Sequence, residues 1–202
     1  MLIVCTGNIC RSALAERLAR AYLDDALGED AATIRVQSAG TQAVIGSGVH
    51  PDSALVLAGF GGDPTGFVAR QLADDMAIDA DLTLTLTRAH RREVLKAAPR
   101  AMQRTFTLHE AAALVELVGD VELDGDGLAD RCRSLVKALA AARSRRTSDT
   151  ADDIADPIGQ PLDVHQQVGE EIAQALLPLL HRLVSLRTAA NAGESSPVPL
   201  SR

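Results

Sequence analysis

The chain has 202 residues, of which 47% are hydrophobic and 23% are charged, and its formal net charge is −7. This length suits one globular domain with a hydrophobic core, and the negative charge argues against nucleic acid as the main partner. Aromatic residues make up only 2% of the chain, so the core must be built from aliphatic side chains.

The sequence also limits where the protein works. No apolar run approaches the length of a membrane span, and no charged-then-apolar leader precedes the first apolar run at residues 2–4. Three cysteines, an odd number, do not suggest a disulfide framework. We therefore expect no membrane association and a location in the reducing cytoplasm.

The first predicted element is a buried strand over residues 2–4, where Leu-Ile-Val forms a short apolar run. A helix is expected over residues 13–24, and a strand-to-helix turn, residues 5–12, joins the two. Gly7 and Asn8 are residue types that tolerate positive φ, so the turn can curl tightly. Such a curl directs successive backbone N–H groups into one concavity, and the helix N-terminus adds positive potential. The pattern predicts an oxyanion-binding loop.

Two side chains in this loop suggest a reaction. Cys5 would lie at the bottom of the concavity, where amide donors and Arg11 favour the nucleophilic thiolate. Arg11 offers a planar guanidinium that can bind a phosphate-like dianion through two hydrogen bonds. In-line attack of the sulfur on phosphorus would give a phosphocysteine, and the Ser12 hydroxyl could hydrogen-bond the sulfur as it leaves. The alternative is that Cys5 is a buried small hydrophobic residue at a strand end.

The rest of the chain alternates predicted strands and helices. Thr87 is expected to cap the helix that follows it. Further strands are expected over residues 33–37, 80–86 and 103–107, and further helices over residues 51–58, 88–97, 108–118, 128–139 and 168–183.

Three segments are expected to be irregular. Residues 119–127 are acidic and glycine-rich but lack the final Glu of a calcium-binding loop, so we expect an exposed linker. Residues 143–153 are charged and are expected to form a surface loop. Residues 188–202 are rich in Ala, Gly, Ser and Pro and are expected to be a disordered tail, which leaves residues 1–187 as a single domain.

The segment Val-Cys-Thr-Gly-Asn-Ile-Cys-Arg-Ser, residues 4–12, resembles the phosphate-binding loop of the low-molecular-weight protein tyrosine phosphatases, bacterial ones in particular. The resemblance continues less tightly through residues 38–41, 69–72 and 85–95, and through Asp156-Pro157. It implies a cytoplasmic hydrolase with a doubly wound α/β fold. About four parallel strands would carry helices on both faces, with the phosphate-binding loop after the first strand. It also implies that no metal or other cofactor is needed.

The resemblance assigns roles to residues of the loop. Cys5 takes the position of the nucleophile and Arg11 that of the phosphate-binding cation. Asn8 and Ser12 take positions that brace the loop, and Ser38 could brace it through Asn8 or could simply be a polar strand-end residue. The predicted phosphate-binding residues are Thr6, Gly7, Asn8, Ile9, Cys10, Arg11 and Ser12.

A general acid is needed because a departing alkoxide or phenoxide must be protonated. Asp156 matches the Asp-Pro dipeptide that carries this acid in the family, and the same carboxylate could then take a proton from the attacking water. By spacing alone, Asp152, Asp153 and Asp163 compete with it.

Some positions depart from the family pattern. Phe67 occupies the place where the family usually has a His behind the loop. Ile158 and Gly159 stand where tyrosine-specific members have aromatic residues, which thins the wall around a phenyl ring. Ile9 stands where a related phosphoarginine-hydrolysing group carries Thr, so it favours phosphotyrosine-like substrates. The expected substrate is a phosphorylated protein or a small aryl phosphate, with inorganic phosphate as a product.

Several alternatives remain open at this level. Arsenate could occupy the same loop, and an external thiol would then be needed to reduce it because no relay cysteines lie near residues 80–95. The others are a protein-arginine phosphatase and a phosphopeptide-binding module without turnover. Cys10 could form a reversible disulfide with Cys5 under peroxide or could be a buried loop residue. Cys132 falls on the predicted core face of its helix and is expected to be structural.

Overall fold

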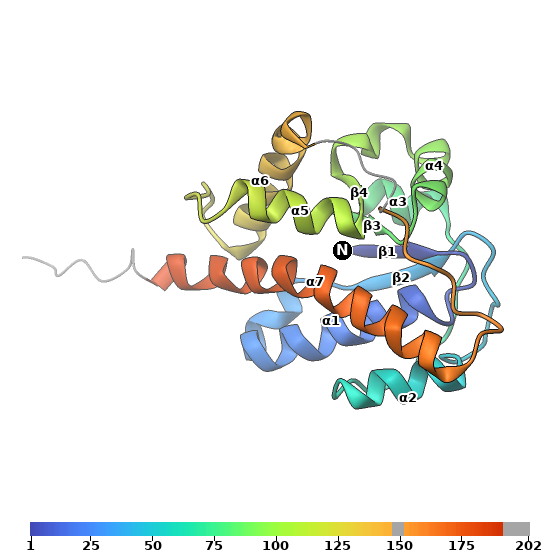
Figure 1. Cartoon of the computed structure of the whole chain (residues 1–202). Helices are drawn as coiled ribbons and strands as arrows, with labels where there is room; N and C mark the ends of the chain where they lie inside the picture. The colour runs from blue at the N-terminus through green and yellow to red at the C-terminus, as the bar shows by residue number, and fades with distance from the viewer. Residues whose placement is uncertain (147–151, 192–202) are drawn as a thin grey trace, which may run out of the picture.

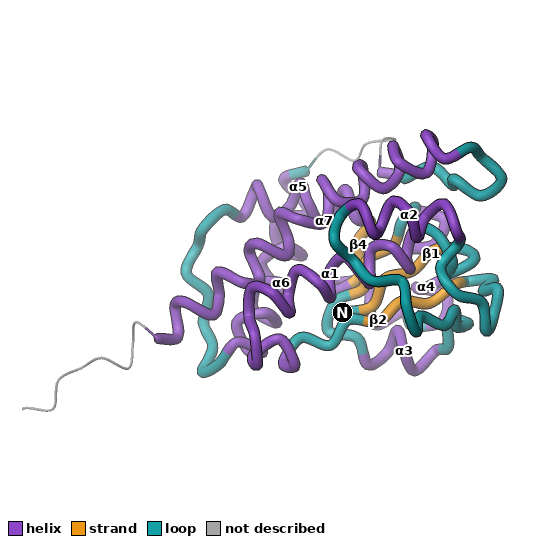
Figure 2. Tube along the Cα trace, turned by 90° about the horizontal axis from the view of Figure 1, so that it is seen from below, coloured by secondary structure: helices purple, strands orange, loops and turns teal. Residues whose placement is uncertain are grey.

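The computed structural model describes residues 1–146 and 152–191. The described chain contains a four-stranded, all-parallel sheet in the order β2-β1-β3-β4. Figures 1 and 2 show the strands enclosed by helices. The strands are β1 Leu2–Cys5, β2 Gln37–Gly40, β3 Thr83–Thr85 and β4 Thr105–Thr107. The predicted doubly wound α/β fold is therefore confirmed.

The two faces of the sheet pack against different helices, and alternate residues of β1 contribute to each face. Ile3 belongs to the larger core, which α1, α5, α6 and α7 share, while Leu2 and Val4 belong to a smaller core with residues of α3 and α4. Helix α2 packs against α1 and α7. The helices are α1 Arg11–Leu27, α2 Pro51–Gly59, α3 Asp74–Asp79, α4 Arg88–Ala97, α5 Leu108–Val118, α6 Leu128–Ala142 and α7 Leu162–Asn191.

Side-chain caps define the start of two helices. Thr87 accepts a hydrogen bond from the backbone of His90 and begins α4, as the sequence predicts. Thr107 and Glu110 form a reciprocal capping box at the start of α5. Because β3 and β4 end immediately before α4 and α5, these caps fix both helices at the carboxyl edge of the sheet.

The second strand lies elsewhere than predicted. Residues Gly28–Thr33 form a 3₁₀ helix, and the strand begins only at Gln37 and runs to Gly40. The strand predicted over residues 33–37 was wrong, because Ile34 and Val36 pack into the larger core ahead of the observed strand. Burial of these two side chains produces the alternation of a strand, although residues 34–36 belong to no strand of the described chain.

Other boundaries also shift. The first helix begins at Arg11, and β4 is shorter than predicted because Pro99–Arg104 forms a 3₁₀ helix. Residues 143–153 are not simply a surface loop: Arg143–Arg145 form a 3₁₀ turn, and Asp152 is only 5% exposed. Residues 147–151 lie outside the described chain.

The final helix, α7, continues through Pro178 and reaches Asn191. It therefore includes the first part of the predicted tail, and residues 192–202 of that tail lie outside the described residues. Among the described residues, none of the helices is both long enough and apolar enough to cross a bilayer.

Candidate active site

The candidate site lies at the carboxyl edge of the sheet, where β1 runs between β2 and β3. Cys5 is the last residue of β1 and pairs in register with Gly40, the last residue of β2. Residues 6–10 then connect Cys5 directly to α1. In an open α/β sheet this edge, at the point where the strand order changes direction, is the usual ligand position.

The loop surrounds the Cys5 thiol in the way that the sequence predicts. The backbone N–H of Asn8 points to Cys5 Sγ at 3.3 Å, and Ser12 Oγ lies 2.9 Å from the same sulfur. The amides of Gly7, Ile9 and Cys10 donate no hydrogen bond to any acceptor within residues 1–146 and 152–191. A cavity of about 210 Å³ is lined by Cys5, Thr6, Gly7, Ile9, Cys10, Arg11, Gln42, Val44, Asp156 and Ile158.

Asn8 holds the curl of the loop. It is fully buried and is the one non-glycine residue of the described chain with positive φ, at 54°. Its Nδ2 donates to Ser12 Oγ at 2.9 Å and to Ser38 Oγ at 2.7 Å, and its Oδ1 accepts from the backbone of Arg70 at 2.9 Å. Ser38 in turn donates to Glu16. One buried amide side chain thus links the loop to α1, β2 and the segment around Arg70.

Arg11 and Asp156 lie together at the cavity. Arg11 is 4% exposed; its Nη2 forms an ion pair with Asp156 Oδ2, and its Nη1 donates to the Ile154 carbonyl at 3.0 Å. The Arg11 Nε atom is buried and has no hydrogen-bond partner among the described residues. The two groups assigned to phosphate binding and acid catalysis are therefore in contact, although they are 145 positions apart in the chain.

The segment that carries Asp156 is attached to the sheet on its N-terminal side. The Ile154 amide donates to the Leu86 carbonyl at 2.9 Å, as a strand residue would. Asp153 accepts from the Arg88 backbone at 2.6 Å and from its guanidinium at 3.2 Å. Asp152 pairs with Arg146. Of the four acidic candidates, Asp152 and Asp153 are thus engaged in this attachment, and Asp156 lines the cavity.

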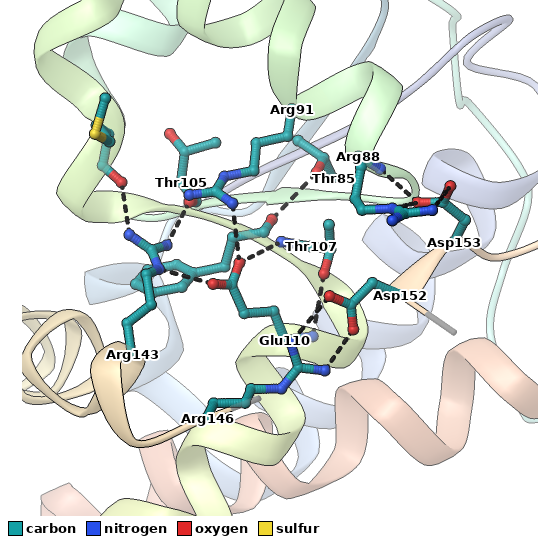
Figure 3. A network of polar contacts seen from close by, with 12 residues as sticks. Thr85, Arg88, Arg91, Thr105, Thr107, Glu110, Arg143, Arg146, Asp152 and Asp153 are labelled. Atoms are coloured by element: carbon teal, nitrogen blue, oxygen red, sulfur yellow. Dashed lines mark hydrogen bonds and ion pairs between the residues drawn. The ribbon is translucent and has the colours of Figure 1, made fainter. Parts of the chain in front are cut away.

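Figure 3 shows how this attachment continues into a network of ion pairs at β3, β4 and α5. Glu110, 5% exposed, accepts from Arg143 Nε at 2.7 Å and lies 3.7 Å from Arg91. Arg143 also donates to the Thr105 and Met102 carbonyls. Because Glu110 also completes the cap of α5, the buried charge fixes the helix, the strand and the segment after α6 relative to one another.

His90 was missed by sequence reasoning. Its side chain is buried, with Nε2 2.9 Å from the Thr6 hydroxyl of the loop and Nδ1 2.9 Å from the hydroxyl of Thr87. Burial lowers the pKa of His90 to about 4, and the Arg11 cation acts in the same direction. The carboxylates of Asp156 and Asp153 oppose this shift. A neutral His90 therefore supports Thr6. The available signal was its position in the first turn of the helix that follows β3.

The remaining candidates have simpler surroundings. Phe67, in the place of the family His, is 5% exposed and packs beneath Ile9 and the start of α1. Cys132 packs against the larger core, and burial raises its pKa to about 11. Burial also raises the pKa of Cys10 to about 11. The Cys10 sulfur lies within 4.8 Å of one ring nitrogen of His50 and one of His165.

The fold and the loop together define an α/β protein with a cysteine in an oxyanion-type loop after its first strand. The family model described as "Low molecular weight phosphotyrosine protein phosphatase" matches residues 1–124, more than half of the chain. The chain therefore belongs to the low-molecular-weight phosphotyrosine protein phosphatase family.

Individual relatives agree with this membership. The chain is 35% identical over 99 residues to the low molecular weight protein-tyrosine-phosphatase Wzb of Escherichia coli K12. These 99 residues are 49% of this chain but only 62% of that protein, so the match spans less than two thirds of Wzb. The crystal structure of a low molecular weight protein tyrosine phosphatase from T. tengcongensis is 28% identical, with a TM-score of 0.63 over 90% of this chain and 97% of that one. The YwlE arginine phosphatase from Geobacillus stearothermophilus, 24% identical with a TM-score of 0.63 over 98% and 97%, shares the fold.

Proposed function

We propose that the protein is a phosphatase that hydrolyses phosphotyrosine-like phosphomonoesters through a phosphocysteine intermediate. The observation that carries the proposal is the position of Cys5 Sγ at the base of a 210 Å³ cavity that Arg11 and Asp156 also line. Hydrogen bonds from the Asn8 amide and the Ser12 hydroxyl to the sulfur would stabilise a thiolate and later a leaving sulfur.

The bound phosphoryl group would use loop amides and the Arg11 Nε atom, which have no hydrogen-bond partner among the described residues, together with Arg11 Nη2. Its equatorial oxygens would accept from the loop amides of Gly7, Ile9 and Cys10. The same oxygens would accept from Arg11 Nε and Nη2, the bidentate edge of the guanidinium. Because Nη2 pairs with Asp156 in this structure, substrate binding would exchange one anion for another at Arg11.

That exchange would free Asp156 for its two proton transfers. Sulfur attacks phosphorus in line while Asp156 protonates the departing oxygen, and the carboxylate formed then takes a proton from the water that hydrolyses the phosphocysteine. The products are the alcohol or phenol and inorganic phosphate. Because the reaction requires a free Cys5 thiol, we expect it in the reducing cytoplasm.

The rim of the cavity supports an aryl phosphate. Ile9, Val44 and Ile158 line it, and Val44 and Ile158 are about half exposed. These aliphatic side chains would enclose a phenyl ring in place of the aromatic residues that the sequence lacks at positions 158 and 159. Phosphoarginine would instead place a guanidinium against this apolar rim, where Asp156 is the only carboxylate that lines the cavity among the described residues. A protein phosphotyrosine is therefore our preferred substrate.

Initial rates on phosphotyrosine, phosphoarginine and arsenate, measured under one set of conditions, test the substrate. The fastest turnover is expected with phosphotyrosine, and arsenite release that depends on an added thiol would instead support arsenate reduction. Phosphopeptide binding without phosphate release would support the binding module. Turnover that survives Cys5→Ser would refute the mechanism.

Aryl phosphates of graded leaving-group acidity test Asp156. Asp156→Ala should slow the substrates with the poorest leaving groups most, by about 100-fold or more, because only they need protonation. Asp163→Ala is the matched control, since Asp163 is exposed in the first turn of α7 and should leave all rates unchanged. An equal effect of Asp156→Ala on every leaving group would argue against the acid role.

A further inference from the structure

A second cluster of reactive side chains lies behind the phosphate-binding loop. One ligand atom from each of Cys10, His50 and His165 lies within 4.8 Å of the others. Each residue belongs to the N-terminal end of a different helix. Cys10 is the N-cap of α1 and His50 that of α2, while His165 lies in the first turn of α7. We call these three residues the Cys-His-His cluster.

The cluster contains imidazole nitrogens that the protein does not satisfy. The His165 side chain is fully buried, and its Nε2 has no hydrogen-bond partner among the described residues; His50 Nδ1 is likewise buried and without one. The rings stack with centroids 4.9 Å apart and an interplanar angle of 13°. Unpaired buried polar atoms are costly, so two of them on side chains that neighbour a thiol indicate a missing ligand.

Asp52 and Ser53 lie beside the Cys-His-His cluster, and Asp52 is the nearest candidate for a fourth ligand. Asp52 Oδ2 lies 3.9 Å from His50 Nδ1 and 4.0 Å from His165 Nε2, too far for a hydrogen bond. Ser53 Oγ lies 2.9 Å from His165 Nδ1. When Nδ1 donates to Ser53, the lone pair of His165 is on Nε2, the nitrogen that has no hydrogen-bond partner among the described residues. A metal-binding histidine usually has this arrangement, with one nitrogen hydrogen-bonded and the other free to bind the ion.

We propose that Cys10, His50, His165 and Asp52 bind a zinc-like divalent metal ion. A tetrahedral site of thiolate, two imidazoles and a carboxylate is a common zinc environment. Metal–ligand bonds of about 2.0 to 2.3 Å place tetrahedral donors about 3.3 to 3.6 Å apart. The three cluster atoms, which lie within 4.8 Å of one another, need to close by about 1 Å, and Asp52, which lies outside that group, needs to move further. Binding releases the Cys10 proton, and the thiolate and carboxylate then balance the two positive charges of the ion.

The ion would act on the phosphate-binding loop, a consequence that rests on the proposed function, although the site itself does not. Cys10 lines the Cys5 cavity, and the backbone of His50 donates to the Ile9 carbonyl at 2.8 Å. Movement of Cys10 towards the histidines would displace the adjacent loop amides. A shift of about 1 Å can cost about 100-fold in rate, so we expect bound zinc to inhibit reversibly.

The test uses cobalt as a spectroscopic substitute for zinc on the full chain, reduced and stripped of metal. Wild type should bind one Co²⁺ with thiolate-to-metal charge-transfer and tetrahedral d–d absorption, and Zn²⁺ should displace it. Cys10→Ser should lose the charge-transfer band. Cys5→Ser and Cys132→Ser are the matched controls and should keep it, which separates this site from the catalytic thiol and from catalysis.

His50→Gln provides a second variant, because the His50 side chain is 26% exposed and should tolerate substitution. It should weaken Co²⁺ binding by about tenfold or more. Absence of the charge-transfer band in wild type would overturn the proposal. So would a band that Cys5→Ser removes and Cys10→Ser retains, or an unchanged affinity in a folded His50→Gln. Failure of phosphatase activity with an intact cobalt spectrum would count against the proposed function alone.

Discussion

Replacement of Asn8 by Ala should destabilise the protein by about 4 kcal/mol and disable the loop. The substitution removes three hydrogen bonds from a fully buried side chain, worth about 1 kcal/mol each. We use this low value per hydrogen bond because two of the partners are not left unsatisfied. Ser12 keeps its contact with Cys5, and Ser38 keeps its bond to Glu16. Ala at a φ of 54° adds about 1 kcal/mol.

Urea unfolding measures this loss against a typical total stability of about 5 to 15 kcal/mol, so the variant should still fold. A double-mutant cycle with Ser38→Ala isolates one of the three bonds, and the two residues should couple by about 1 kcal/mol. The rate on an aryl phosphate should fall by about tenfold or more as the amides lose alignment. A loss below about 1 kcal/mol, or strictly additive effects of Asn8→Ala and Ser38→Ala, would refute the bracing role.

Three further predictions concern the surroundings of the loop. The pKa of His90 is about 4 in the folded protein and about 6.5 in the unfolded chain, so the unfolded chain binds a proton first as pH falls. Between about pH 6.5 and pH 4, wild type should therefore lose about 3 kcal/mol of unfolding free energy relative to His90→Gln, as measured by denaturant titrations. Gly40→Ala should place Cβ against the Thr6 carbonyl, costing about 2 kcal/mol by urea unfolding and lowering kcat. Thr107→Ala should lower the unfolding free energy by about 1 kcal/mol by removing the α5 cap.

Much of the site could be predicted because its parts are close in sequence. Cys5, Asn8 and Arg11 share one short loop, and the strand before it and the helix after it dictate where that loop must lie. The predicted cap at Thr87 is equally local, since a side chain and the backbone three residues ahead decide it. These features could therefore be predicted without a structure, because local backbone geometry determines them.

The substrate rim could not be predicted in this way. Val44 reaches the cavity from the loop after β2, and Ile158 from the segment after α6, so neither belongs to a local pattern around Cys5. Sequence comparison with the family suggested a thin wall beside Asp156. The folded chain instead supplies aliphatic side chains from separate segments, which only the packing of those segments brings together.

The sequence by itself determined an oxyanion-type loop between a strand and a helix, because short-range periodicity and turn-compatible residues encode it, and its resemblance to the low-molecular-weight phosphatases implied the parallel α/β fold. Only the tertiary structure decided that Arg11 meets Asp156, that His90 supports Thr6 and that Cys10 faces His165. The physical reason is that each of these contacts joins segments at least 84 positions apart, the separation in sequence between Thr6 and His90. Contacts of that kind leave no periodic trace, since they depend on how helices and strands pack.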